Sequence, residues 1–100
     1  MKYNVVYLPI ANRDINRINK ALADYPGKAK RLFQEIEKKV KTLEDIPYMW
    51  PKYQIMPIYH RMVLEDHLLF YVVDENERNI KIYRVLYSKM DITKQINVTD

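Results

Sequence analysis

The sequence contains no cysteine, a single glycine and only two histidines. Without cysteine the chain has neither a disulfide framework nor a thiolate metal site, and the two histidines do not show the spacing of a zinc motif. No apolar run approaches the roughly 20 residues of a membrane span, and the first residues do not resemble a cleavable signal. We therefore expect a cytoplasmic protein without a cofactor, a bound metal or a membrane contact.

Hydrophobic residues make up 48% of the 100 residues, and nine residues are tyrosines. This proportion is far above that of disordered chains, and the length suits one hydrophobic core. Residues 1–100 should therefore form a single domain. Seventeen Lys and Arg against thirteen Asp and Glu give a net charge of +4, which favours an anionic partner such as RNA, DNA or an acidic protein segment.

The first half of the chain predicts one strand and two helices. Tyr3–Leu8 is rich in β-forming residues, and Pro9 ends the run because it cannot donate to a sheet. Apolar residues then recur at helical spacing, and Pro26 with Gly27 should break this first helix. A second apolar stripe, from Ala29 to Leu43, predicts the longer helix. The first stripe consists of Ala11, Ile15, Ile18 and Leu22.

The second half predicts an irregular loop followed by three strands. Residues 45–57 contain three prolines and should form an ordered apolar loop. The β-like runs Ile58–Leu64, His67–Val73 and Ile80–Tyr87 should form an antiparallel meander, with the middle run central and covered on both faces. Residues 91–100 fit either a short terminal helix or a frayed tail.

The order of elements predicts an α+β fold, β-α-α-β-β-β. The two N-terminal helices should pack on one face of an antiparallel sheet, because each helix has one apolar stripe to bury. The opposite face of the sheet would then be available for function.

Four segments carry a family pattern that spans nearly the whole chain: VVYLPIANRDINRI, LEDIPYMWPKY, YHRMVLEDHLLFYVVDE and IKIYRVLYSKMDI. Together they resemble the RelE/ParE superfamily of toxins from type II toxin–antitoxin systems. Its pattern has an Ala-x-x-Asp-Leu/Ile helix start, a Leu-x-x-x-Pro helix end, a Tyr-Arg strand and a strand ending Arg-Ile-Leu-His-Gly-x-Arg-Asp. The residues that match or nearly match are Ala11, Asp14, Ile15, Leu43, Pro47, Tyr59, Arg61, Arg84, Val85, Leu86 and Asp91.

The resemblance implies a toxin that a cognate antitoxin neutralises by forming an oligomeric complex with it. Members of the family either cut mRNA in the ribosomal decoding site or poison DNA gyrase. The first hypothesis is a ribosome-dependent mRNA endonuclease, an mRNA interferase that inhibits translation. The alternatives are a ParE-like gyrase poison of the plasmid-stabilisation type, and a degenerate toxin-like protein that only binds its antitoxin.

Metal-independent RNA cleavage by a ribose 2′-hydroxyl needs a proton acceptor, a proton donor and cations that stabilise the charge on the phosphate. Family nucleases supply these groups from the sheet and from the region near the C-terminus. The catalytic candidates that the resemblance implies are Arg61, His67, Arg84, Tyr87 and Lys89. The candidates for RNA binding are His60, Lys81 and Tyr83.

The sequence departs from the nuclease pattern at several positions. Leu68 stands where many nucleases have an arginine, Tyr87 replaces the usual histidine and Ser88 replaces the glycine. Met90 stands at the position of the second arginine, and Lys89 would supply that charge one residue earlier. A lysine lacks the bidentate fork of an arginine.

Three further observations bear on these candidates. Strict strand alternation would place Arg84 and Tyr87 on opposite faces, so both can line one pocket only if a bulge intervenes. A structural alternative for Arg84 is an ion pair with Asp14 or Asp91. His60 and His67 flank a predicted tight turn, where exposed histidines are common.

Overall fold

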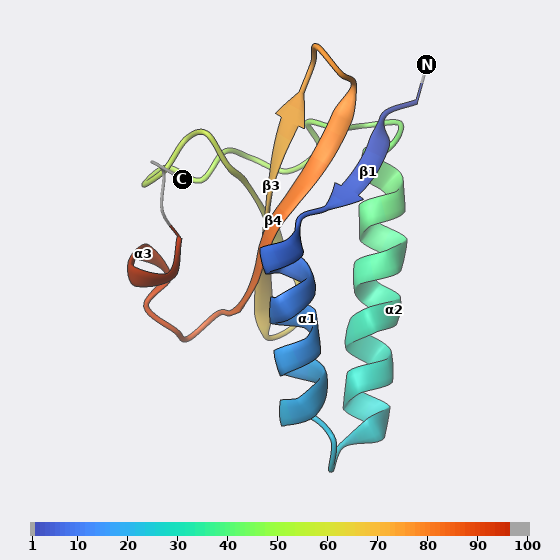
Figure 1. Cartoon of the computed structure of the whole chain (residues 1–100), viewed down its shortest axis with the longest axis vertical. Coiled ribbons are helices and arrows are strands. Elements are labelled where there is room, and N and C mark those ends of the chain that lie inside the picture. Colours follow the sequence, from blue (N-terminus) through green and yellow to red (C-terminus); the bar gives the residue numbers. More distant parts are fainter. Residues whose placement is uncertain (1, 97–100) are drawn as a thin grey trace.

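The computed structural model describes residues 2–96, which form a layered α+β structure (Figure 1). The elements, in chain order, are β1 (Asn4–Tyr7), α1 (Pro9–Ala21), α2 (Pro26–Leu43), β2 (His60–Val63), β3 (His67–Asp74), β4 (Asn79–Tyr87) and α3 (Ile92–Gln95). This order confirms the predicted α+β fold with two N-terminal helices. Of the predicted terminal segment, residues 92–95 form the short helix α3, and residues 97–100 lie outside the described residues.

The four strands form one sheet in the order β1-β4-β3-β2. β2, β3 and β4 are antiparallel neighbours, as the meander predicted, and β3 lies inside the sheet. β1 pairs parallel to β4, from Asn4 opposite Asn79 to Tyr7 opposite Ile82, so the sheet is mixed rather than wholly antiparallel. Two helices and a long loop separate β1 from the meander, and a connection of that length permits a parallel pairing.

Both long helices begin with a proline. Pro9 is the first residue of α1 and Pro26 is the first residue of α2. The first N–H groups of a helix have no partner inside the helix, and the fixed φ of proline suits this position. Pro26 and Gly27 were expected to break the chain between the helices, but they start the second one. None of the helices within residues 2–96 combines the length and the apolarity needed to cross a membrane.

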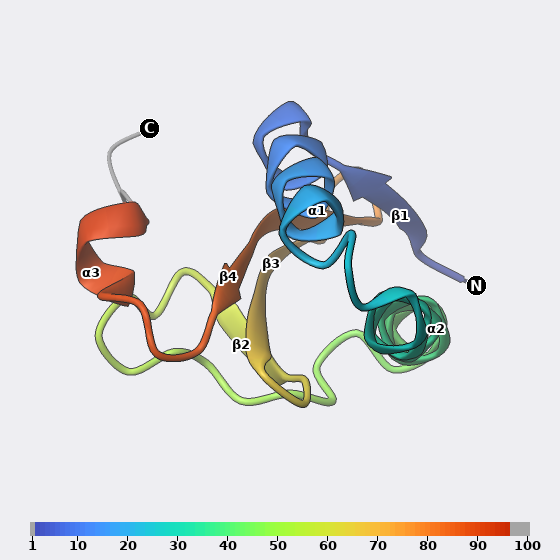
Figure 2. The same cartoon turned by 90° about the horizontal axis from the view of Figure 1, so that it is seen from below.

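The main core lies between the two long helices and one face of the sheet (Figure 2). Buried helix residues in this core are Ala11, Ile18, Leu32, Ile36, Val40 and Leu43. The strands contribute Met62, Leu69, Tyr71, Ile80, Ile82 and Val85. The Tyr71 hydroxyl donates to the Pro47 carbonyl oxygen at 2.9 Å, which fixes the start of the connection between α2 and β2 to the sheet.

The opposite face of the sheet is not open, contrary to the expectation from the sequence. The loop from residue 51 to 59 and α3 lie over it, as Figure 2 shows. Tyr53 and Tyr59 pack edge-on against Phe70, with ring centroids 5.2 and 6.4 Å apart, and Leu86 and Ile96 complete this second cluster. The aromatic side chains of the proline-rich loop therefore close the face that the helices leave uncovered.

A β-bulge interrupts the pairing of β3 with β4. Phe70 lies opposite Arg84 and Tyr71 lies opposite Ile82, so Tyr83 is an extra residue in β4. The bulge shifts the alternation, and Ile82 and Val85 both face the helices. The bulge precedes both Arg84 and Tyr87, and the register from Arg84 to Tyr87 is regular, so these two residues remain on opposite faces of the sheet and do not line one pocket.

Candidate functional site

A cavity of about 310 Å³ opens where the end of the sheet meets the two long helices. The second half of α1, the first turn of α2, the start of β3 and the end of β4 surround it. Its lining residues are Arg17, Ile18, Ala21, Leu22, Lys28, Asp66, His67, Val85, Leu86, Tyr87 and Met90. The walls are mainly apolar, and titratable side chains border it.

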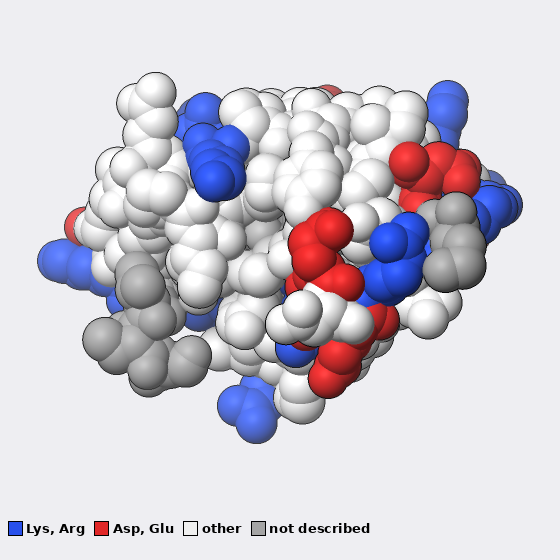
Figure 3. All heavy atoms as spheres, turned by 90° about the horizontal axis from the view of Figure 1, so that it is seen from above, with Lys and Arg blue, Asp and Glu red and all other residues white. Residues whose placement is uncertain are grey.

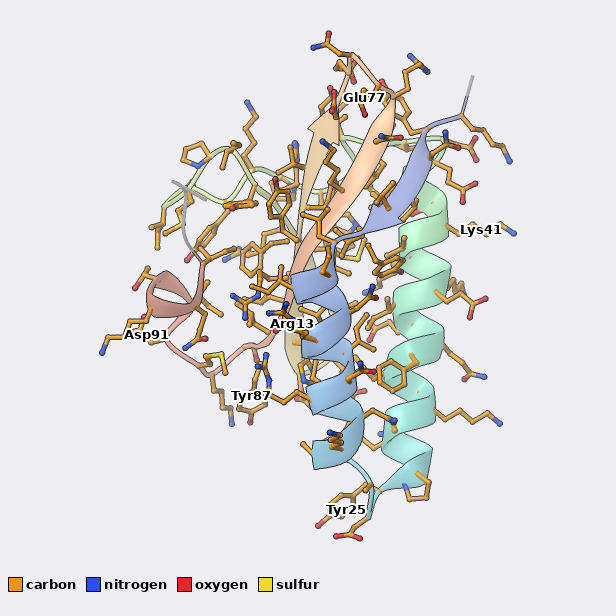
Figure 4. All side chains as sticks on the ribbon, viewed as in Figure 1. Arg13, Tyr25, Lys41, Glu77, Tyr87 and Asp91 are labelled. Carbon is orange, nitrogen blue, oxygen red and sulfur yellow. The ribbon has the colours of Figure 1, made fainter. Side chains whose placement is uncertain are left out.

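His67 and Tyr87 form the aromatic part of this cavity. They lie opposite one another in the register of β3 and β4, and their rings meet edge-on with centroids 5.7 Å apart. Figure 4 shows Tyr87 beside the second half of α1. The Tyr87 side chain is exposed, whereas only 8% of His67 is exposed. The pair therefore combines one buried and one accessible polar group.

Burial determines the charge state of His67. Desolvation lowers the pKa of His67 below its usual 6.5 and Lys28 lowers it further, against an opposing effect of Asp66. The imidazole is therefore neutral at physiological pH, a state in which it can accept a proton. Within residues 2–96, the buried Nδ1 atom of His67 has no hydrogen-bond partner.

Two cations that the sequence did not single out border the same cavity. Arg17 pairs through Nη2 with the Asp14 carboxylate, but 58% of its side chain is exposed. Lys28 Nζ lies 3.3 Å from Asp66 Oδ2, and 47% of its side chain is exposed. No motif marks either residue, because the packing of α1 and α2 against the sheet brings them together.

Arg84 is buried away from this cavity. Its Nε atom donates to Asp14 Oδ2 at 2.7 Å, its Nη2 atom donates to Asp14 Oδ1 at 3.0 Å, and Nη1 donates to the Gln95 carbonyl oxygen. The sequence suggested an ion pair of Arg84 with Asp14 or Asp91, and the structure shows the pair with Asp14. Asp91 instead pairs with Lys94 at 4.0 Å. Arg84 joins β4 to α1 and to the end of α3.

Three further candidates lie on the sheet face that the loop and α3 cover. The Arg61 guanidinium lies over the Tyr53 ring, 5.7 Å from its centroid. Lys81 Nζ pairs with Asp74 Oδ2 at 3.1 Å, and Tyr83 packs edge-on against Tyr59. These residues do not line the cavity.

His60 and Lys89 complete the set of predicted residues. His60 is buried, its Nδ1 atom lies 2.7 Å from the Trp50 carbonyl oxygen, and its ring stacks on Tyr71. The expectation that the histidines are exposed is therefore wrong for both. Lys89 is exposed in the turn after β4, beside Met90 of the cavity. The structure thus brings His67 and Tyr87 together, with Lys89 close by in the chain.

No group of three or more His, Asp or Glu side chains that could hold a metal ion occurs within residues 2–96. The chemistry of the cavity rests on one neutral imidazole, one phenol and the cations at its rim. These groups can accept a proton, donate a proton and attract an anion.

Comparison with known proteins identifies the family. Residues 5–92 match the family model described as the ParE toxin of the type II toxin–antitoxin system parDE. The chain belongs to the ParE toxin family. This membership confirms the RelE/ParE resemblance of the sequence segments. The search of the curated proteins found no significant match.

Solved structures of toxin–antitoxin proteins share the fold of this toxin. A double mutant of the E. coli toxin RelE in the free state is 15% identical, with a TM-score of 0.74 over 99% of this chain and 97% of that chain. The ParDE system of P. aeruginosa gives 20% identity and a TM-score of 0.71, over 86% and 96% of the two chains. The RelBE2 complex of Mycobacterium tuberculosis gives 18% identity and a TM-score of 0.63, over 87% of this chain and 99% of that chain.

Proposed function

We propose that this toxin inhibits translation by cutting mRNA on the ribosome, with His67 and Tyr87 as its catalytic pair. The observation that carries the proposal is the neutral, buried imidazole of His67 in ring contact with Tyr87. Both border a cavity whose rim holds the cations Arg17 and Lys28. A proton acceptor, a proton donor and positive charge are the three requirements of metal-independent RNA cleavage.

The proposed reaction is a transfer of the phosphate within the RNA strand. His67 Nε2 accepts the proton of a ribose 2′-hydroxyl, and the 2′-oxygen attacks the adjacent phosphorus atom. The bond from phosphorus to the 5′-oxygen of the next nucleotide breaks, and this oxygen takes the Tyr87 hydroxyl proton. The products are a 2′,3′-cyclic phosphate and a 5′-hydroxyl. The proton on His67 then returns to Tyr87 through water, and Lys89 lies in the next turn to attract the phosphate.

The test is cleavage of mRNA on translating ribosomes by the purified toxin, followed by primer extension. His67→Gln and Tyr87→Phe should each lower the cleavage rate about 100-fold or more, the usual effect of losing a general acid or base. Tyr25→Phe is the matched control, because Tyr25 is exposed and does not line the cavity. An inactive wild-type toxin, or full activity of both cavity variants, would contradict the proposal.

Gyrase poisoning is the second candidate function. It is favoured by the partners of Arg84 and Lys81, since Asp14 and Asp74 already engage these two predicted cations. A gyrase-binding toxin needs a recognition surface rather than acid–base groups, so it tolerates this arrangement. Supercoiling of a plasmid by gyrase separates the candidates, because only the gyrase poison should leave relaxed or cleaved DNA. Failure of both assays, with antitoxin binding intact, would indicate the degenerate toxin-like protein.

An antitoxin is the proposed protein partner in every case. The related RelBE2 structure is a toxin–antitoxin complex, and the P. aeruginosa structure is a ParDE toxin–antitoxin system. We expect the partner segment to carry apolar anchors and acidic residues that complement the exposed cations of this chain. Co-expression with the neighbouring reading frame, followed by size-exclusion chromatography, tests whether a complex of more than one chain forms.

A further inference from the structure

The cavity beside His67 has the dimensions and the chemistry of a binding site for one small ligand. Ligand pockets run to roughly 300–1,000 Å³, and this cavity of about 310 Å³ is at the lower end of that range. Ile18, Leu22 and Met90 supply apolar walls, and Tyr87 supplies an aromatic edge. Such walls suit a flat ring system rather than a long or strongly hydrated molecule.

A buried polar atom without a partner indicates what such a ring must carry. His67 is 8% exposed, and its Nδ1 atom is buried without a hydrogen-bond partner within the described residues 2–96. If Nε2 is left unprotonated to accept a proton, Nδ1 carries the hydrogen and needs an acceptor. A ring nitrogen or carbonyl oxygen of a nucleobase would satisfy this donor and hold the imidazole in one orientation.

The rim of the cavity indicates an anionic group on the same ligand. Arg17 and Lys28 come from two different helices and both border the cavity. Each pairs with one carboxylate, Asp14 and Asp66 respectively, but 58% and 47% of their side chains remain exposed. Lys28 lies in the first turn of α2, whose N-cap residue, Tyr25, makes no side-chain cap hydrogen bond. The positive end of the α2 dipole therefore adds to the charge of Lys28.

We propose that the cavity binds one nucleotide of the RNA substrate, with the base between the apolar walls and Tyr87 and the phosphate at Arg17 and Lys28. This inference rests on the proposed function, because it names the substrate group that occupies the proposed catalytic site. Arg17 and Lys28 are binding residues in this site. The base completes the hydrogen bonding of His67, so substrate binding and imidazole orientation are coupled.

An aliphatic side chain from a partner protein is a weaker fit to the same features. It would fill the apolar volume, but it would leave the buried His67 Nδ1 without a hydrogen-bond acceptor, which is unfavourable. It would also bring no negative charge to the two cations at the rim. A nucleotide meets the apolar, the hydrogen-bonding and the charge requirements with one molecule.

The test is a titration of the purified toxin with adenosine, cytidine, guanosine and uridine 3′-monophosphates, followed by calorimetry and by the ring NMR signals of His67. At least one nucleotide should bind and shift these signals. Arg17→Gln and Lys28→Gln should each weaken binding about tenfold, as expected for a partly exposed charge-assisted hydrogen bond. The matched controls are Arg13→Gln on α1 and Lys30→Gln on α2, which are exposed and do not line the cavity.

Inorganic phosphate and the free nucleosides are the control ligands. If phosphate binds as tightly as the nucleotides, the site is a simple anion site and the inference is wrong. The inference is also wrong if no nucleotide shifts the His67 signals, or if the cavity variants bind like the controls. Nucleotide binding without mRNA cleavage would refute the proposed activity and leave the proposed nucleotide site standing. Equal rates of mRNA cleavage by Arg17→Gln and Arg13→Gln would refute the proposed nucleotide site and leave the proposed activity standing.

Discussion

Asp14 Oδ2 accepts one hydrogen bond from Arg84 Nε at 2.7 Å and another from the backbone N–H of Val85 at 3.0 Å. The second bond takes the place of a hydrogen bond from a neighbouring strand. The pairing of β1 with β4 stops at Ile82, whose carbonyl oxygen accepts from the Leu8 N–H. Beyond that point α1 lies along the edge of β4. One carboxylate of α1 therefore satisfies both the backbone and the arginine that follow the bulge.

Replacing Asp14 should destabilise the protein strongly. Asp14→Ala leaves the buried Arg84 guanidinium without its carboxylate, and removing one partner of a buried ion pair costs about 3–5 kcal/mol. Urea unfolding followed by circular dichroism measures the loss. Asp24→Ala, an exposed residue after α1, should change the free energy of unfolding by less than about 0.5 kcal/mol. Equal stabilities of the two variants would refute a structural role for the pair.

The sequence predicted those features that depend on local periodicity. The stripe from Ala29 to Leu43 identified α2, and the continuous apolar run from Leu68 to Val73 identified β3 as a central strand. The sequence offered Asp14 and Asp91 as alternative partners for Arg84, and the structure shows the pair with Asp14. Local patterns were sufficient in these cases, since each element buries its own apolar face.

The features that the sequence did not predict depend on contacts between distant segments. The bulge at Tyr83 has no glycine to mark it, and the cover provided by Tyr53 and Tyr59 depends on how a proline-rich loop folds back. The two rim cations, Arg17 and Lys28, come together only through the packing of α1 and α2 on the sheet. Tertiary packing, rather than propensity, positions these residues.

The buried imidazole of His67 should make the protein less stable in acid. The pKa of His67 is lowered in the folded state, chiefly by desolvation, so the unfolded chain binds a proton more readily as the pH falls through 6.5. The stability is thus fully present above pH 6.5 and is lost as the pH falls toward the pKa of the folded state. Comparing urea unfolding at about pH 7.5 and about pH 5 measures this loss.

His67→Gln provides the control for the acid effect, because glutamine has no charge to gain. The loss of stability between the two pH values should be smaller in this variant than in the wild type. The ring NMR signals of His67 should titrate with a midpoint below 6.5. A midpoint above that value would show that the imidazole is charged near neutrality, and it would remove the proton acceptor from the proposed reaction.

The only glycine of the chain sits in the first turn of α2 and should be replaceable. A Cβ atom built on Gly27 meets nothing within 4 Å, and its φ angle is not positive. Gly27→Ala should stabilise the protein by about 0.4–1 kcal/mol, because alanine restricts the unfolded chain and favours the helix. Thermal unfolding measures the gain, with Ala29→Gly as the opposite change in the same turn region. A lower melting temperature for Gly27→Ala would contradict the prediction.

Glu75 in the β3–β4 turn fixes two tyrosines from other parts of the chain. Tyr3 and Tyr48 both donate to Glu75 Oε1, at 2.5 and 2.6 Å. Figure 3 looks onto this end of the molecule and shows acidic side chains gathered on one side of it. The hydrogen bond that Tyr48 donates to Glu75 raises the pKa of Tyr48 to about 12, since the carboxylate favours the protonated phenol. The same two hydroxyls lower the pKa of Glu75.

Glu75→Gln should therefore move the pKa of Tyr48 from about 12 back toward 10.0. An amide oxygen still accepts a hydrogen bond, but it carries no charge that opposes ionisation of the phenol. A pH titration of ¹³C-labelled tyrosine, with the signal assigned by Tyr48→Phe, measures the change. Glu77→Gln in the same turn, labelled in Figure 4, removes an equal charge that does not bind Tyr48. If both glutamine variants shift Tyr48 equally, the general field of the turn, rather than the Glu75 contact, holds the phenol protonated.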